Sequence, residues 1–271
     1  MDDAVSIRAV NLGKRFLREG WEPHFGMHRL AEETLRAPFR ILRRSLGGGS
    51  PAAPAPDRYF WALRGVSFEI ARGQVTGLIG PNGAGKSVLL KMLSRVTQPS
   101  EGFAEIRGRV GSILEGGAAF HPELTGRENL HLSGTLFGMD KREVAHKLAR
   151  IVEFAEIASF FDTPVKHYST GMIVRLAFAV CVHLHRDVLL IDETLATGDE
   201  AFRKRCIQTI RSLADAGRTV LFVSHDPGLV AEICDRCLYL EGGRLFDDGP
   251  TAEMLSRYGA RARRGARGSA A

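Results

Sequence analysis

The sequence predicts an α/β fold with a mainly parallel central sheet. Three apolar runs have the length of buried strands: Gln74 to Ile79, Val188 to Ile191 and Thr219 to Val223. Helical patterns near residues 200 to 215 and 227 to 233 follow the last two runs. Strands that alternate with helices over short loops are typical of a parallel sheet covered by helices.

Further strands are predicted on either side of these runs. Residues 5 to 10 and 66 to 70 alternate between apolar and polar residues, as half-buried strands do. Residues 104 to 114 are expected to contain short strands, and Leu238 to Leu240 another. A long insertion, residues 17 to 57, separates the first two strands.

The insertion combines an amphipathic stretch with a linker. Leu30 to Leu46 spaces apolar residues at roughly helical intervals among arginines, and residues 47 to 56 are rich in Gly, Pro and Ala. One interpretation is a segment that lies on a membrane surface or beside a membrane protein. The other is a solvent-exposed loop without a function of its own.

A helical subdomain is predicted in the middle of the chain. From Arg127 to about Val182 the pattern is mostly helical, with breaks near Gly138 and Pro164. We expect this subdomain to span about residues 115 to 184, inserted into one domain of residues 1 to 258.

The composition is that of a globular protein. The chain has 271 residues, 44% of them apolar and 25% charged, which excludes a disordered chain, a collagen-like repeat and a small disulfide scaffold. The longest uncharged apolar run, Leu176 to Leu184, is about half of the roughly 18 residues that a membrane span requires. The N-terminus shows no basic-then-apolar pattern, so we expect no secretory signal.

The positive net charge comes from the C-terminal end. Lys and Arg total 37 against 31 Asp and Glu, which gives +6. The last fifteen residues contain no acidic residue and five arginines, namely Arg257, Arg261, Arg263, Arg264 and Arg267. The remainder is nearly neutral, so we expect no nucleic-acid partner. Residues 259 to 271 are predicted to be a disordered basic tail, with contact to anionic lipid as the alternative.

The four cysteines are predicted to be reduced and packed in the core. Cys181 and Cys206 stand alone, whereas Cys234 and Cys237 have the spacing of a redox motif. The flanks of this pair look like a helix end that runs into a buried strand, which favours packing over a redox or metal role.

A glycine-rich loop predicts a phosphate-binding site. Residues 80 to 87 fit the pattern G-x-x-x-x-G-K-[ST], directly after a strand and at the start of a helix expected over Gly85 to Arg95. Backbone N–H groups in such a loop face an anion, and the helix N-terminus adds partial positive charge. Lys86 should reach the β- and γ-phosphates, and Ser87 should bind Mg²⁺. The expected ATP-binding residues here are Gly80, Pro81, Asn82, Gly83, Ala84, Gly85, Lys86 and Ser87.

Polar residues end two other predicted strands. Asp192 and Glu193 follow Val188 to Ile191, and two carboxylates at the end of a buried strand need a chemical reason. Asp192 is suited to hold Mg²⁺ through water, and Glu193 to polarise the attacking water. His225 follows Thr219 to Val223 and should reach the γ-phosphate from the same sheet edge.

Together these motifs resemble the ATP-binding subunit of ABC transporters, over nearly all of the chain except residues 17 to 57 and the tail. The family's signature loop, usually Leu-Ser-Gly-Gly-Gln, reads Tyr-Ser-Thr-Gly-Met at residues 168 to 172, so Ser169 and Gly171 match. The resemblance implies a P-loop NTPase cassette with a mainly parallel central sheet, an antiparallel β-subdomain and an inserted helical subdomain.

Other site residues carry over by the same resemblance. Glu115 stands where the family normally has a Gln, which makes it a metal candidate beside Ser87 and Asp192. Asp199 matches the aspartate that contacts the second protomer. The aromatic residue that stacks on adenine usually precedes the second strand. Its candidates are Tyr59, Phe60, Trp61 and Phe16.

Three stretches are similar to one subfamily, which exports polysaccharides on lipid carriers, such as O-antigen, capsule and teichoic acid. They are residues 120 to 130, the signature at 168 to 172, and residues 192 to 202. Some members carry a C-terminal carbohydrate-binding domain, which we expect this chain to lack because it ends soon after Tyr258.

The resemblance implies a head-to-tail homodimer with two ATP molecules between the protomers. Residues near Glu115 to Phe137 should contact an integral membrane permease, present in two copies, at the cytoplasmic face of the inner membrane. The alternatives are an ABC ATPase for another cargo, a soluble ABC ATPase acting on ribosomes or DNA, and a regulatory module without turnover. The last is disfavoured because both Glu193 and His225 are present.

Overall fold

The computed structural model describes residues 4–17, 59–113, 120–136, 139, 141–183, 186–192 and 199–268. Two predicted site residues, Glu115 and Glu193, lie outside these ranges, and so does nearly all of the predicted insertion. The backbone divides into two compact units, Met1–Lys14 with Ala62–Ala271, and Arg15–Trp61.

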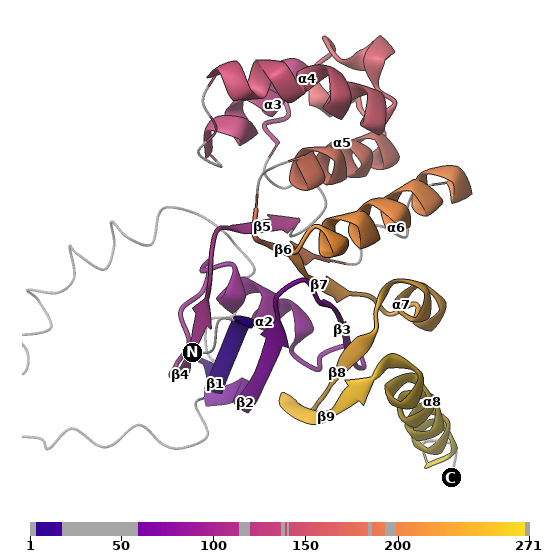
Figure 1. Ribbon diagram of the computed structural model, residues 1–271. Coiled ribbons are helices and arrows are strands. Elements are labelled where there is room, and N and C mark those ends of the chain that lie inside the picture. The colour runs from indigo at the N-terminus through magenta and orange to yellow at the C-terminus, as the bar shows by residue number, and fades with distance from the viewer. Residues whose placement is uncertain are drawn as a thin grey trace, which may run out of the picture. The chain divides into compact units, whose positions relative to one another are not determined.

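A six-stranded central sheet confirms the predicted α/β fold (Figure 1). Its strand order is β5-β6-β7-β3-β8-β9, and all neighbours run parallel except β8 and β9. The strands are β3 (Val75–Ile79), β5 (Val110–Ile113), β6 (Val188–Ile191), β7 (Thr219–Val223), β8 (Arg236–Glu241) and β9 (Arg244–Pro250). The sequence analysis did not predict β9, which forms a hairpin with β8. Gly242 and Gly243 make its turn, with φ of 55° and 75°, values that fit the tight turns typical of hairpins.

The central strands are buried on both faces. Every residue of β3, β6 and β7 is buried, and alternate side chains enter two different cores, as the two-residue period of a strand requires. Leu189 and Phe222 lie in one core, and Leu190 and Leu221 lie in the other. Both faces of this sheet must therefore be covered by other elements.

Different helices cover the two faces. α2 (Lys86–Leu93) packs on one face together with an antiparallel sheet of order β2-β1-β4. The strands of that sheet are β1 (Val5–Leu17), β2 (Tyr59–Ala71) and β4 (Glu101–Ile106). Residues of α5 (Thr170–His183), α6 (Glu200–Asp215), α7 (Pro227–Ile233) and α8 (Thr251–Gly268) fill the core on the opposite face.

The predicted helical stretch contains α3 (Gly126–Leu136), α4 (Lys141–Ala155) and α5, with short 3₁₀ turns at Ala158–Phe160 and Val165–His167. These elements share a core of their own, and α5 also belongs to the core beneath the sheet. In Figure 1, α5 accordingly lies between α3 and α4 on one side and α6 on the other.

The C-terminal helix differs from expectation. We placed the end of the folded domain at residue 258 and expected a disordered tail, but α8 continues to Gly268. Its start is held by the core: Met254 is buried, and the ring of Tyr258 packs edge-on against Tyr239 at 5.4 Å. Within the described residues, no helix combines the length and the apolar character needed to cross a membrane.

The cysteines pack in the core, as predicted. All four are buried and free of disulfides. Cys234 and Cys237 lie against the backbone of β3, because a Cβ on Gly77 would meet the Sγ atoms of Cys237 and Cys234 at 2.7 and 3.3 Å. Burial raises the pKa of the Cys181 thiol to about 12 and that of Cys206 to about 12.

We predict that the native thiols react very slowly. A thiolate is the reactive form of cysteine, and a raised pKa lowers the thiolate fraction at pH 8. Labelling with a thiol-specific disulfide reagent should count almost no thiol in the folded chain and four in denaturant. Rapid labelling of one or more cysteines in the folded chain would contradict the packing role.

Candidate functional site

The carboxyl ends of three adjacent strands meet at one edge of the central sheet. β6, β7 and β3 are neighbours in that order, with Ile191 opposite Phe222 and Val223 opposite Leu78. Directly after these strands come Asp192, the pair Ser224 and His225, and Gly80. This is the edge at which open parallel sheets bind ligands, and it brings Asp192 and His225 to the same side as the glycine-rich loop.

The glycine-rich loop has positions that exclude a side chain. A Cβ on Gly80 would lie 2.2 Å from the carbonyl oxygen of Leu240, and one on Gly85 would lie 2.6 Å from Leu63 Cδ2. The φ angles of these glycines, 151° and 102°, are also unfavourable for other residues. The loop therefore presents its backbone, as a phosphate cradle requires.

Lys86 places a cation inside this loop. It is only 8% exposed, and its Nζ donates hydrogen bonds to the carbonyl oxygens of Gly80 at 2.6 Å and Pro81 at 3.1 Å. These acceptors offset the cost of burying an ammonium group. An anion that binds in the loop would meet both this charge and the backbone.

The start of α2 is suited to bind an anion. Its N-cap residue is Gly85, which has no side chain to cap the helix, and no acidic residue stands in its first turn. The partial positive charge of the helix end is therefore not compensated from within the helix itself. Ser87 is exposed in the first turn of this helix.

The donor set fits Mg²⁺. The hydroxyl of Ser87 and the carboxylate of Asp192 are oxygen ligands, which this hard cation prefers. Among the described residues, no group of three or more His, Cys, Asp or Glu side chains forms a metal cluster. A site built from one hydroxyl and one carboxylate leaves room for phosphate oxygens and water, as nucleotide sites do.

The signature residues stand on a different helix. Ser169 is exposed and caps α5, since its Oγ accepts a hydrogen bond from the Met172 N–H at 3.2 Å. Its O–H remains a donor, so it is suited to contact a phosphate oxygen. α5 packs on the face of the sheet opposite to α2.

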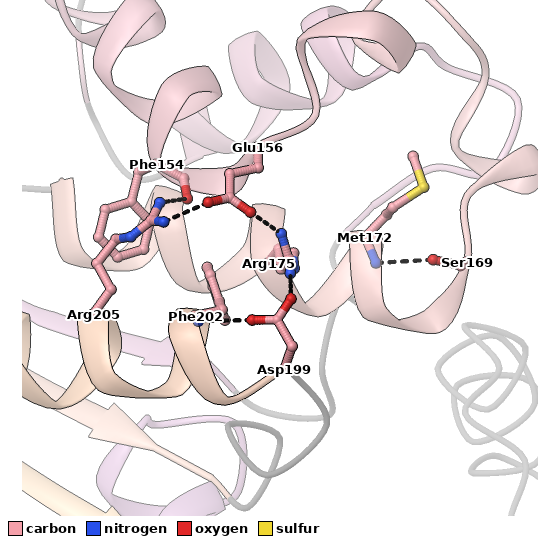
Figure 2. Close-up of polar contacts among 8 residues, drawn as sticks. All are labelled: Phe154, Glu156, Ser169, Met172, Arg175, Asp199, Phe202 and Arg205. Carbon is pink, nitrogen blue, oxygen red and sulfur yellow. Dashed lines mark hydrogen bonds and ion pairs between the residues drawn. The ribbon is translucent and has the colours of Figure 1, made fainter.

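Asp199 caps α6. Its Oδ1 accepts a hydrogen bond from the Phe202 N–H at 2.8 Å, and its Oδ2 pairs with Arg175. The Phe202 N–H, followed by the Arg175 charge, holds the pKa of this carboxyl below its ordinary value. Figure 2 shows Arg175 between Asp199 and Glu156.

The candidate aromatic residues belong to the smaller unit. There the Arg15 guanidinium lies over the rings of Tyr59 and Trp61, at 4.8 and 6.0 Å from their centroids. Phe16 stacks on Phe60 at 5.7 Å. Adenine stacking by Tyr59 or Trp61 stays a prediction, as do the roles of Glu115 and Glu193.

The loop before α3 is held in place by residues of the stretch 120 to 130, to which the sequence analysis assigned no individual structural roles. The buried Asn129 side chain accepts from the His121 N–H at 2.7 Å and donates to the carbonyls of His121, Leu124 and Thr125, each at 3.0 Å. Thr125 and Glu128 exchange backbone-to-side-chain hydrogen bonds of 2.8 and 3.2 Å. Their T-x-x-E spacing is a capping-box signal that was readable in the sequence.

Comparisons with known proteins agree with this geometry. Residues 63–196 match the family model described as ABC transporter. The chain is 45% identical over 201 residues to the O-antigen export system ATP-binding protein RfbB of Klebsiella pneumoniae, covering 74% of this chain and 82% of the relative. It is 36% identical over 200 residues to the teichoic acids export ATP-binding protein TagH of Bacillus anthracis, covering 74% of this chain and 36% of that one.

The fold also matches a solved structure. A dimeric ATP-binding cassette, MJ0796, in a post-hydrolysis state bound to ADP and phosphate superposes with a TM-score of 0.69 at 19% identity, covering 90% of this chain and 98% of the other. From the extent of its identity to RfbB and from the family match, the chain belongs to the ABC transporter family.

Proposed function

We propose that this chain is the ATP-binding and ATP-hydrolysing subunit of an ABC exporter for polysaccharide or lipid-linked glycan. The observation that carries the ATPase assignment is the loop of residues 80–87, which places the buried Lys86 cation inside a backbone cradle at the carboxyl edge of the sheet. The cargo class is supported by relatives named for O-antigen and teichoic acid export.

The loop and the strand ends divide the chemical work on ATP. Lys86 and the N-terminus of α2 hold the β- and γ-phosphates, while Ser87 and Asp192 would hold Mg²⁺, which neutralises phosphate charge when bound. Glu193 polarises the attacking water, and His225 contacts the γ-phosphate. His225 is exposed and lies in the turn before α7, where the Asp226 N–H donates to Ser224 Oγ at 3.1 Å.

Two protomers complete each site. Ser169 and the phosphate loop belong to helices on opposite faces of the sheet, which supports a head-to-tail dimer. In this dimer Ser169 and Gly171 of one protomer contact the γ-phosphate held by the other, and Asp199 faces the second protomer. ATP closes the dimer, and hydrolysis opens it.

The dimer drives a separate membrane protein. We infer that residues near Glu115 to Phe137 dock on two copies of an integral permease at the cytoplasmic face of the inner membrane. The pinned loop from His121 to Thr125 suits this role, because a rigid contact transmits movement better than a loose one.

The first test is removal of the loop cation. Lys86→Ala should weaken ATP binding about tenfold or more, because a hydrogen bond to a charged group contributes about 1.5 to 3 kcal/mol. ATP affinity would be measured by calorimetry on the purified chain. Cells that carry only this variant should lose surface polysaccharide.

Lys91→Ala is the matched control, since Lys91 lies on the same helix, in its last turn. It should leave ATP affinity unchanged. If Lys86→Ala bound ATP with wild-type affinity, the assignment of the phosphate loop as the ATP-binding site would be wrong. Normal surface polysaccharide with impaired ATP binding would instead reject the cargo assignment.

The second test separates ATP binding from hydrolysis. Glu193→Gln should bind ATP normally but turn over at least about 100-fold more slowly, because a positioned general base contributes about 10² to 10⁴ to the rate. Light scattering should then detect a dimer that persists with ATP. Glu200→Gln, on the exposed start of α6, should keep wild-type turnover. Normal turnover by Glu193→Gln would show that another group activates the water.

A further inference from the structure

Three helices of the larger unit meet at an aromatic cluster. Phe154 comes from α4, Phe178 from α5 and Phe202 from α6. The ring centroid of Phe154 lies 5.8 Å from that of Phe178 and 5.8 Å from that of Phe202, and the last two are 6.2 Å apart. The junction of the helical subdomain with the sheet core is therefore packed.

A forked ion pair spans the same three elements (Figure 2). Arg175 of α5 uses Nη1 to pair with Glu156, which follows α4, and Nη2 to pair with Asp199, which caps α6. The Arg175 side chain is only 18% exposed, and its guanidinium lies 4.8 Å from the centroid of the Phe202 ring. Its two nitrogens thus bind two carboxylates that come from different parts of the chain.

Glu156 is held in an unusual conformation at this point. Its φ is 56°, a left-handed value that is uncommon outside glycine. Its second oxygen pairs with Arg205 of α6, which also donates to the Phe154 carbonyl at 3.2 Å. The hydrogen bonds from Arg205 and Arg175 keep the pKa of this carboxyl below its ordinary value. Glu156 is therefore charged at neutral pH and available to both arginines.

Arg175 lies between two functional segments of the chain. Towards the N-terminus, α5 begins at the residue after Ser169. On the other side, Asp199 is separated from Glu193 only by residues 194–198. A rotation of α5 relative to α6 that moved the two side chains apart would break the contact between Arg175 and Asp199.

We propose that Arg175 is a positioning residue that fixes the signature helix α5 against the end of the loop that carries Glu193. This inference rests on the function proposed above and deepens it. When Ser169 binds the ATP of the second protomer, the Arg175 fork holds Asp199 at a fixed position relative to α5. Asp199 is the residue at which the loop after Glu193 ends. Glu156 keeps the fork oriented by occupying its other nitrogen.

The two-pronged geometry of Arg175 allows a positioning role to be distinguished from a general contribution to stability. A lysine offers one point charge and cannot present two fixed nitrogens to two carboxylates. Arg205 supplies a matched control, because it also pairs with Glu156 and lies over an aromatic ring, that of Phe154 at 5.7 Å. Within the described residues, Arg205 forms its ion pair with Glu156 and makes no hydrogen bond to Asp199, on which it acts only through its charge.

The test measures ATP turnover by the purified full-length chain and its variants. Arg175→Met and Arg175→Lys should each lower kcat about tenfold or more while KM for ATP changes less than about threefold, since small misplacements of catalytic groups are costly in kcat. Arg205→Met should keep kcat within about twofold of wild type, with a loss of melting temperature similar to that of Arg175→Met. Wild-type kcat in Arg175→Lys, or equal kcat losses in Arg175→Met and Arg205→Met, would overturn the proposal.

A second measurement does not depend on turnover. Hydrogen exchange of the Phe202 amide, which donates to Asp199, should be faster in Arg175→Met than in Arg205→Met or wild type without nucleotide. Unchanged exchange in Arg175→Met would refute the positioning role even if the ATPase assignment holds. If exchange is faster in Arg175→Met but the wild-type chain hydrolyses no ATP, the positioning role of Arg175 is supported and the proposed function is rejected.

Discussion

The burial of the central strands on both faces is the constraint on which the site depends. Because every residue of β3, β6 and β7 is buried, the chain must supply helices on both sides of the sheet. The phosphate loop opens α2 on one face, and Ser169 opens α5 on the other. The parallel order then leaves one edge where Asp192, His225 and the loop meet. A second protomer supplies the signature residues to that edge in the mechanism we propose.

Helix α5 links the two halves of this arrangement. Leu176 and Val180 lie in the core of the helical subdomain, and Phe178 and Val182 lie in the core beneath the sheet. A helix shared by two cores cannot move without repacking one of them, which favours discrete positions over gradual movement. Arg175 adds a polar connection at the same place, between the end of α4 and the start of α6.

Local signals in the sequence predicted most of the fold and the phosphate loop. β6 and β7 have the predicted bounds, because each is a short run that is apolar throughout except for Thr219. The turn at Gly242 and Gly243 was a readable hairpin signal that the sequence analysis passed over. The extension of α8 beyond residue 258 was not predicted, because its glycines have low helix propensity and an acid-free basic end is typical of a disordered tail, whereas its start is held by packing of Tyr258 on Tyr239. The Arg175 fork was not predictable, since its partners are far apart in the sequence and no spacing rule relates them.

The most direct measurement of the central claim asks whether ATP lies between the phosphate loop of one protomer and α5 of the other. Asn82 and Thr170 are exposed, and the native cysteines are buried. Two single variants, Asn82→Cys and Thr170→Cys, would be mixed with a short bismaleimide and a slowly hydrolysed ATP analogue. A double variant that carries both substitutions in one chain would be treated in the same way. The account predicts a cross-linked dimer containing one chain of each variant, formed only with nucleotide. An intramolecular cross-link in the double variant without nucleotide, and no cross-linked dimer with it, would contradict the account.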